Sequence, residues 1–214
     1  VQDGNTYNVF VGNGQPLVMG SESYDMTAVP SAADPSRITI GYTLPNGNTV
    51  QSEDGSVTGG SIGGLLRFRS QSLDQAQNAI GRLSLAIGQV FNNQHKLGID
   101  LNGATGTDLF SLGQPTTYAN ANNKSNAVAT ATITNAGSLT TSDYSLKFDG
   151  TNYSLTRLSD NTVVATSTSL SGISADGISV SLNGPMSAND SFLIQPTRNA
   201  AAGLGTLITD PAKV

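Results

Sequence analysis

The sequence lacks cysteine and tryptophan, has a single histidine, and carries charge on only 12% of its 214 residues. Without cysteine the chain has no disulfide framework, no thiolate zinc site and no cysteine nucleophile. Lys and Arg number 10 against 15 Asp and Glu, which gives a formal net charge of −5. Because a phosphate backbone would be repelled by this balance, we expect no nucleic acid among the partners.

Long apolar runs are also missing, and none approaches the roughly 20 residues of a membrane-spanning helix. We therefore expect no membrane insertion. The chain opens Val1-Gln2-Asp3-Gly4, without a methionine and without the charged-then-apolar pattern of a cleaved signal peptide. We interpret the sequence as an excised fragment, and any export signal could lie outside it.

In place of charge the chain is rich in small residues, including 24 Gly, with 37% of all residues apolar. Ser, Thr, Asn and Gly favour tight turns and solvated strand faces. The composition therefore predicts a folded, β-rich chain with many turns.

Strand patterns occupy two stretches, residues 1–60 and residues 127–195. The first contains strand-like runs at 7–11, 16–19 and 37–42, separated by turn residues, and the last of them alternates with period two. The clearest β signal is in the second, where Tyr144–Phe148 turns at 149–152 and returns as 153–158. This pattern predicts a hairpin, and further runs at 163–165, 178–182 and 191–194 predict a small antiparallel β domain.

One strong helix signal covers residues 72–97. Ser72 and Gln75 form a capping box at its predicted start, and Gly98 supplies a predicted left-handed stop. Apolar residues recur within it at alternating spacings of three and four, a heptad pattern typical of helix–helix packing. The members of this apolar stripe are Leu73, Ala76, Ile80, Leu83, Ile87 and Val90.

Two glycines, Gly81 and Gly88, lie seven residues apart inside the predicted helix. A glycine in a helix interior costs about 1 kcal/mol relative to alanine. We therefore predict that both are close-packing positions, where another backbone approaches the helix. The apolar stripe needs partner helices, and no second long stripe occurs in the chain. We expect those partners to lie outside the fragment, with the stripe serving helix packing and assembly.

The predicted fold class is α+β and mainly β. One long amphipathic helix with short strands and hairpins is followed by a small antiparallel β sandwich or barrel-like domain. We expect a mixed domain over 1–118, a β domain over 119–198, and a return segment over 199–214 that leads toward a missing C-terminal helix. The polar residues 114–126 are interpreted as a linker between the first two.

Catalytic patterns are weak. Residues 59–63 fit Gly-x-Ser-x-Gly, but no buried apolar strand precedes them, as a nucleophile elbow requires. His95 has a predicted structural place in the last turn of the helix, and the glycines at 59–64 lack the Lys-Ser/Thr of a phosphate loop. The run 100–103 lacks the ligands of a calcium loop. We expect no catalytic, cofactor-binding or metal-binding residues and no enzyme activity.

Several motifs together resemble a known family. Gly59-Gly60-Ser61-Ile62-Gly63-Gly64-Leu65-Leu66-Arg67-Phe68-Arg69 leads into Leu73-Asp74-Gln75-Ala76-Gln77-Asn78, then Phe91-Asn92-Asn93-Gln94-His95 and Gly106-Thr107-Asp108-Leu109-Phe110. With the segments at 13–18 and 190–198, this ordered set resembles the flagellar hook-associated protein 1 family, which forms the hook–filament junction. The resemblance covers most of the chain and is weakest over 119–180.

The resemblance implies a central fragment of a structural adaptor subunit in the bacterial flagellum, with no cofactor. Implied partners are copies of the chain in a ring or helical assembly, the hook protein, the second junction protein, and an export chaperone for the full-length chain. It also implies an extracellular location, reached by export in an unfolded state without a cleaved signal peptide. The alternative is an extracellular adhesin or binding module, although such a module has no need of an unpaired apolar stripe.

Overall fold

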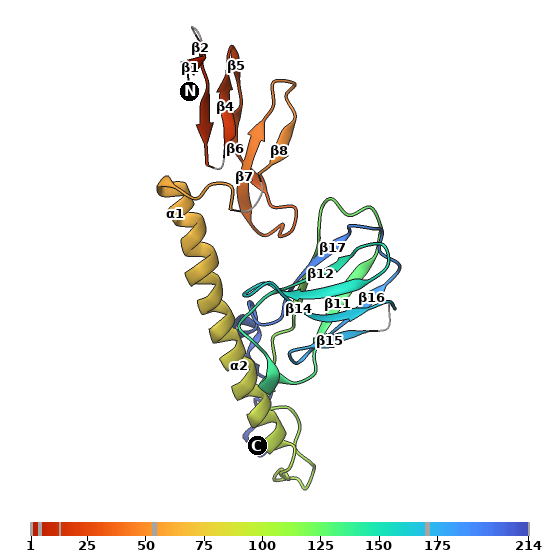
Figure 1. Ribbon diagram of the computed structural model, residues 1–214. Coiled ribbons are helices and arrows are strands. Elements are labelled where there is room, and N and C mark those ends of the chain that lie inside the picture. The colour runs from red at the N-terminus through yellow and green to blue at the C-terminus, as the bar shows by residue number, and fades with distance from the viewer. Residues whose placement is uncertain (1, 4–5, 13, 53–54, 170–171, 214) are drawn as a thin grey trace. The chain divides into compact units, whose positions relative to one another are not determined.

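The structure is a computed structural model (Figure 1), and it describes residues 2–3, 6–12, 14–52, 55–169 and 172–213. Asn13, which begins one of the family-like segments, lies outside the described residues. The chain divides into two compact units, residues 1–73 and residues 74–214. In agreement with the predicted fold class, it combines one helical stretch with many antiparallel strands.

Short antiparallel sheets make up most of the first unit. They pair β1 (Gln2–Asp3) with β2 (Thr6–Tyr7), join β3 (Val9–Val11), β4 (Gln15–Met19) and β5 (Glu22–Ser23), and join β6 (Asp25–Pro30), β7 (Ile38–Thr43) and β8 (Thr49–Gln51). The strands predicted at 16–19 and 37–42 are confirmed as β4 and β7. Few large apolar side chains of this unit are buried, Tyr42 and Val57 among them.

The helical stretch begins 12 residues earlier than predicted. It consists of α1 (Gly60–Phe68), a π-helical segment η1 (Arg69–Leu73) and α2 (Asp74–His95). Ser72 therefore lies inside the helical stretch and does not cap its start, which follows Gly59. Sequence patterns missed α1 because its glycines suggest a turn. At Gly63 a contact in the folded unit explains the glycine, since a Cβ there would lie 2.5 Å from the Thr58 carbonyl carbon.

The other end of the helix also differs from the prediction. Gly98 is not among the glycines with a positive φ, so it provides no left-handed stop. Instead, the Leu97 and Gly98 amides donate to the Gln94 and His95 carbonyls at 3.1 and 3.0 Å, which tightens the last turn.

Two antiparallel sheets form the β part of the second unit. The larger has the order β10 (Thr116–Ala119), β17 (Ser191–Gln195), β12 (Tyr144–Phe148), β13 (Tyr153–Arg157) and β14 (Thr162–Ser167). The smaller has the order β11 (Val128–Ile133), β16 (Ile178–Asn183) and β15 (Ile173–Ala175). The predicted hairpin is confirmed as β12–β13, in which Phe148 faces Tyr153. The predicted linker at 114–126 is wrong for 116–119, because β10 pairs with β17 there.

Apolar side chains from both sheets meet in one core, which makes this part a sandwich. Leu146 and Leu155 of the larger sheet are fully buried together with Ile178 of the smaller sheet. The two sheets also meet at one corner, where the Thr117 hydroxyl donates to the Ala129 carbonyl at 2.7 Å. Among the described strands no ladder joins the two sheets, so the barrel alternative is not adopted.

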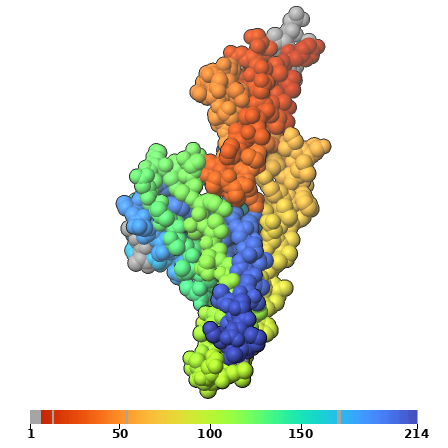
Figure 2. All heavy atoms as spheres, turned by 180° about the vertical axis from the view of Figure 1, so that it is seen from behind, coloured from red at the N-terminus to blue at the C-terminus, as the bar shows by residue number. Residues whose placement is uncertain are grey.

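A short ladder joins the two stretches of chain that enter and leave the sandwich. β9 (Phe110–Ser111) pairs with β18 (Gly205–Thr206), and we call this pair the neck. Three short 3-10 turns complete the unit: η2 (Ala136–Ser138), η3 (Ala201–Gly203) and η4 (Pro211–Lys213). Figure 2 shows the C-terminal segment, in blue, lying along the helix. The domain boundaries at 118 and 198 stay a prediction.

Candidate assembly surface

The outer face of α2 is apolar. Its large side chains from the apolar stripe keep between 45% and 66% of their surface exposed, and Ala76 is exposed as well. The exposed large members on α2 are Ile80, Leu83, Ile87 and Val90. Leu73 is also exposed and ends the π segment of the first unit. An amphipathic helix normally turns its apolar stripe toward the core of its own domain, and here the stripe is turned outward.

The inner face of α2 is polar or small. It carries one large apolar residue, Leu85, and its buried members are Asp74, Asn78, Gly81, Ser84, Leu85, Gly88 and Asn92. The two predicted close-packing glycines lie on this face. A Cβ on Gly81 would lie closer than 3.0 Å to the Thr197 carbonyl oxygen, and a Cβ on Gly88 would meet Leu112. Close contacts at the two glycines and the buried Leu85 side chain therefore hold the helix to its own unit.

A buried ion-pair cluster joins the start of α2 to the sandwich. The Arg198 guanidinium donates from Nη1 to Asp74 Oδ1 at 2.6 Å, and its Nη2 pairs with Asp143 Oδ2. All three side chains are at most 13% exposed. Asn78 lies beside them, where its Nδ2 donates to Asp143 Oδ1 at 3.1 Å and its Oδ1 accepts from the Thr197 hydroxyl at 3.2 Å.

The other end of α2 is held at the neck. The Asn92 side chain makes two hydrogen bonds with the backbone of Phe110, one to its carbonyl and one from its amide, each 2.8 Å long. His95 Nδ1 lies 2.7 Å from the Thr107 carbonyl oxygen, and Lys96 pairs with Asp108 at 2.8 Å. His95 thus has a backbone partner, in keeping with its expected structural place.

Apart from Gly81 and Gly88, sequence analysis missed the residues of this inner face, although a signal for them exists. Asp74, Asn78, Gly81, Leu85, Gly88 and Asn92 repeat with the same alternation of four and three as the apolar stripe. All of them except Leu85 are small or polar, so a search for apolar periodicity passes over them. Arg198 and Asp143 carry no local signal, because the ion pairs of Arg198 reach across 55 and 124 residues of chain.

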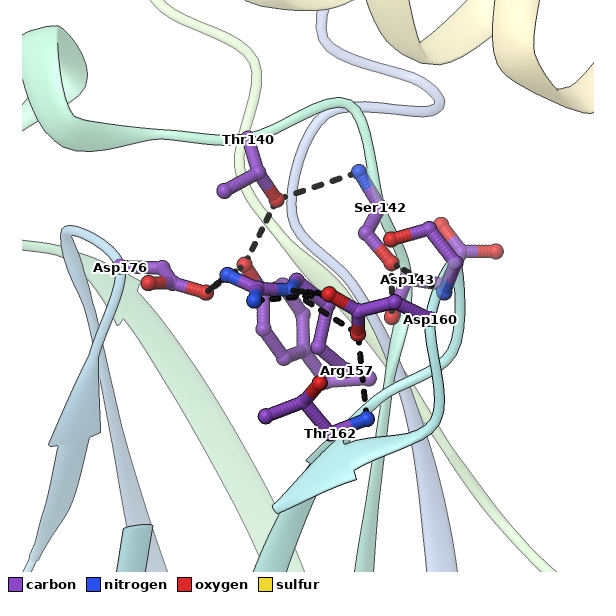
Figure 3. Close-up of polar contacts among 9 residues, drawn as sticks. Thr140, Ser142, Asp143, Arg157, Asp160, Thr162 and Asp176 are labelled. Atoms are coloured by element: carbon purple, nitrogen blue, oxygen red, sulfur yellow. Dashed lines mark hydrogen bonds and ion pairs between the residues drawn. The ribbon is translucent and has the colours of Figure 1, made fainter. Parts of the chain in front are cut away.

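A second polar cluster lies at the same end of the sandwich (Figure 3). Arg157 lies between two carboxylates, donating to Asp160 at 2.8 Å and to Asp176 at 3.0 Å. The Tyr144 hydroxyl donates to Asp176 at 2.9 Å and lies 2.7 Å from the Thr140 hydroxyl. Burial raises the pKa of the Tyr144 phenol well above its ordinary value, so the phenol remains a hydrogen-bond donor.

Two carboxylates of the sandwich have strongly lowered pKa values. Hydrogen bonds from Arg157, and then from the Thr162 amide, lower the pKa of Asp160 to about 2. At Asp190 desolvation acts in the opposite direction. Hydrogen bonds from Ser125, Lys124 and Ser187 outweigh it and lower that pKa to about 2 as well. Both groups stay ionised at neutral pH in the folded chain.

These lowered values predict acid destabilisation of the sandwich. The folded state binds fewer protons than the unfolded state between the ordinary pKa of 3.8 and the folded value of about 2. The stabilisation is therefore present above the unfolded pKa of 3.8 and is lost as the pH falls toward 2. Urea unfolding followed from about pH 6 to about pH 2 should show this loss, and Asp160→Asn should flatten it. An equal slope in Asp160→Asn would contradict the assignment.

The geometry of residues 59–63 and 100–103 does not match the nucleophile elbow or the calcium loop that were considered from the sequence. The strand β8 ends at Gln51, and Ser61 lies in the first turn of α1, so no strand leads directly into a nucleophile elbow. Asp100 Oδ1 accepts from the Asn102 and Ala104 amides at 2.8 Å each, which makes the 100–103 run a tight turn. Across the described residues no group of three His, Asp or Glu side chains is placed to hold a metal ion.

Comparison with known proteins identifies the family. A profile described as the flagellar hook-associated protein FlgK helical domain matches residues 1–110, just over half of the chain. The chain belongs to the FlgK family. A second FlgK profile, the D2-like domain of flagellar hook-associated protein 1, matches residues 118–196. The family resemblance stated from sequence is thereby confirmed.

Individual FlgK proteins agree over the whole chain. Flagellar hook-associated protein 1 of Escherichia coli K12 is 40% identical over 215 residues, and that of Salmonella typhimurium LT2 is 40% identical over 216. The solved structure of the flagellar hook junction protein FlgK from Burkholderia pseudomallei matches with a TM-score of 0.94 and 39% identity, covering all of this chain and 40% of that one.

The matches cover the whole of this chain but only part of each relative. The chain spans 39% of the length of the E. coli and Salmonella relatives, while those matches cover all of this chain. Over the part of the chain that the structure describes, no helix has both the length and the apolar character needed to cross a membrane. The adhesin alternative finds no support among these relatives, since each is named as a hook-associated or hook junction protein.

Proposed function

We propose that this chain is a structural part of the bacterial flagellum at the hook–filament junction, with no catalytic role. The observation that carries the proposal is the orientation of helix α2. Its apolar stripe is exposed, and its buried face is mostly small or polar. Relatives named as hook-associated and hook junction proteins support the location. The stripe is then the surface that other helical segments of the assembly cover.

The size of the apolar stripe supports a stable contact. Ile80, Leu83, Ile87 and Val90 are about half exposed. Covering what remains contributes roughly 0.7–1.5 kcal/mol for each side chain, before the entropy cost of association. Four such residues supply about 3–6 kcal/mol toward holding helical segments of the full-length protein against α2.

The proposed partners are those that the family implies. Copies of the protein contact one another in a ring or helical assembly through heterologous surfaces. The hook protein and the second junction protein flank that assembly, and an export chaperone binds the full-length chain before export. The protein leaves the cell unfolded, without a cleaved signal peptide, and the absence of cysteine suits such a route.

The substitution Leu83→Asp should impair assembly while leaving the fold of this chain intact. Because Leu83 is 61% exposed, the substitution should change the free energy of unfolding of this chain by less than about 1 kcal/mol. In the full-length protein a buried carboxylate would oppose coverage of the stripe, so filaments should fail to attach. Urea unfolding of the chain and a motility assay with the full-length variant measure the two effects.

Gln75→Asp provides the matched control, because it adds the same charge to an exposed helix position outside the stripe. It should leave both folding and motility near the wild type. Full motility in cells carrying Leu83→Asp would contradict the role given to the stripe.

Deletion of the parent gene tests the location directly. Electron microscopy should show hooks without filaments, and flagellin should appear in the medium. Normal filaments on motile cells would contradict the junction role.

A further inference from the structure

The N-terminal half of α2 depends on contacts from distant parts of the chain. Its inner face gives the core of the unit no large apolar side chain before Leu85, and Gly81 lowers its intrinsic helix propensity. The π-helical segment η1, a rare form that interrupts the regular α-helical hydrogen bonding, precedes it. Residues 74–84 therefore need tertiary partners to remain helical.

Many of those partners belong to one loop of the sandwich, Leu139–Asp143, which we call the coupling loop. On the helix side, Asn78 Nδ2 donates to the Thr141 carbonyl at 3.2 Å and to Asp143 at 3.1 Å. The Arg198 ion pair with Asp143 adds a third attachment on this side. Leu139 anchors the other end of the loop in the core, where it is 2% exposed.

The opposite side of the coupling loop is bonded to the sandwich. The Ser142 hydroxyl donates to the Asp143 carbonyl at 2.7 Å and accepts from the Ser159 amide at 3.0 Å, and Ser142 is only 3% exposed. The Leu158 amide donates to the Asp143 carbonyl at 2.9 Å. Thr140 lies 2.7 Å from the Tyr144 hydroxyl, which continues into the Arg157 cluster of Figure 3.

We propose that the coupling loop makes the helical state of residues 74–84 conditional on a closed sandwich. The loop can hold Asn78 and Arg198 only while its other side is fixed by the hairpin and by Ser159. Ala76, Ile80 and Leu83 lie in this half of α2, so their display on a formed helix depends on the sandwich. This inference rests on the proposed function only for the role of the stripe.

The coupling is reciprocal, because a free-energy link between two sites acts equally in both directions. Coverage of the stripe stabilises the helix and therefore the coupling loop. Closure of the sandwich, in turn, prepares the helix for coverage. The C-terminal half of α2 has an attachment of its own, since the neck holds it through Asn92 and Gly88 packs on Leu112.

Ser142→Ala tests the coupling from the sandwich side, without touching the helix. Loss of the buried hydroxyl leaves the Ser159 amide without its acceptor, so opening of the loop becomes easier. Amide hydrogen exchange of this chain should then be about tenfold faster at residues 78–84. Residues 90–95 should change by less than about twofold, because the neck is intact.

Ser167→Ala is the control, since it removes a hydroxyl that bonds only within the turn to Ser169, at 3.0 Å. Ser167 pairs with Tyr153, at the end of β13 away from the coupling loop. Exchange at 78–84 should be unaffected in this variant. Unchanged exchange at 78–84 in Ser142→Ala, or an equal increase in both halves of α2, would overturn the proposal.

A second measurement adds Asn78→Ala. Because Asn78 and Ser142 act through the same loop, the double variant should exchange more slowly than the product of the two single effects predicts. Independent, multiplicative effects would overturn the coupling. If exchange behaves as expected and the full-length Leu83→Asp protein still assembles at wild-type concentrations, the coupling stands and the role of the stripe in assembly fails.

Discussion

Arg198→Met should lower the free energy of unfolding of the second unit by about 3–5 kcal/mol, because it leaves two buried carboxylates without their cation. Arg198 bonds to Asp74 at 2.6 Å and pairs with Asp143, and all three side chains are at most 13% exposed. Methionine retains most of the aliphatic stem, so the loss is mainly electrostatic and not a cavity effect. Urea unfolding followed by circular dichroism measures it.

Lys96→Met is the matched control for this substitution. Lys96 pairs with Asp108 at a similar distance of 2.8 Å, but both side chains are nearly half exposed. Solvent screening limits such a pair to about 0–1 kcal/mol. Similar losses in the two variants would show that burial of the Arg198 cluster has no special weight. Adding Asp74→Asn and Asp143→Asn to Arg198→Met should recover part of the stability, because no unpaired buried charge is left.

Gly81→Ala should destabilise the second unit by about 2–3 kcal/mol, even though alanine is the better helix former. A Cβ at this position would lie closer than 3.0 Å to the Thr197 carbonyl oxygen, which belongs to backbone and cannot rotate away. Either the helix or the segment around Thr197 must shift, and the bonds of Asn78 and Arg198 would lengthen with it. Thermal unfolding of the variant measures the loss.

Replacing Gly64 with alanine should stabilise the protein, the opposite of the effect expected at Gly81. Gly64 lies in α1, and a Cβ there would meet nothing within 4 Å. Gly64→Ala should therefore stabilise α1 by about 0.5–1 kcal/mol through helix propensity alone. Amide exchange read separately in α1 and α2 distinguishes the two responses. A stabilised Gly81→Ala would show that the close approach to Thr197 does not exist in solution.

The features that could be predicted from sequence are those that a local period encodes. The body of α2 and the β12–β13 hairpin follow from the spacing of apolar residues over one or two dozen positions. The start of the helical stretch could not be predicted in this way. Its glycines lower the local signal, and the approach of Thr58 that explains Gly63 is a property of the folded unit.

The residues of the candidate surface also fall into two groups, those that a local period encodes and those that only contacts in the folded chain reveal. Its apolar stripe is periodic, so its residues could be named from the sequence alone. The partners of the polar inner face required the structure, because Arg198 meets Asp74 across 124 residues of chain and Asn78 meets Thr197 across 119. Such pairs leave no mark on local periodicity.

The neck has a consequence for how this protein can change over evolution. Because β9 and β18 lie side by side, the chain enters and leaves the sandwich at a single point. The sandwich is topologically an insertion, and insertions with adjacent ends are the kind that folds tolerate best. The two FlgK profiles also meet near this point, one ending at residue 110 and the other beginning at 118. Lineages can therefore exchange or enlarge the outer part while keeping the helix, provided that each new part again supplies groups that bond to Asp74 and Asn78 of α2.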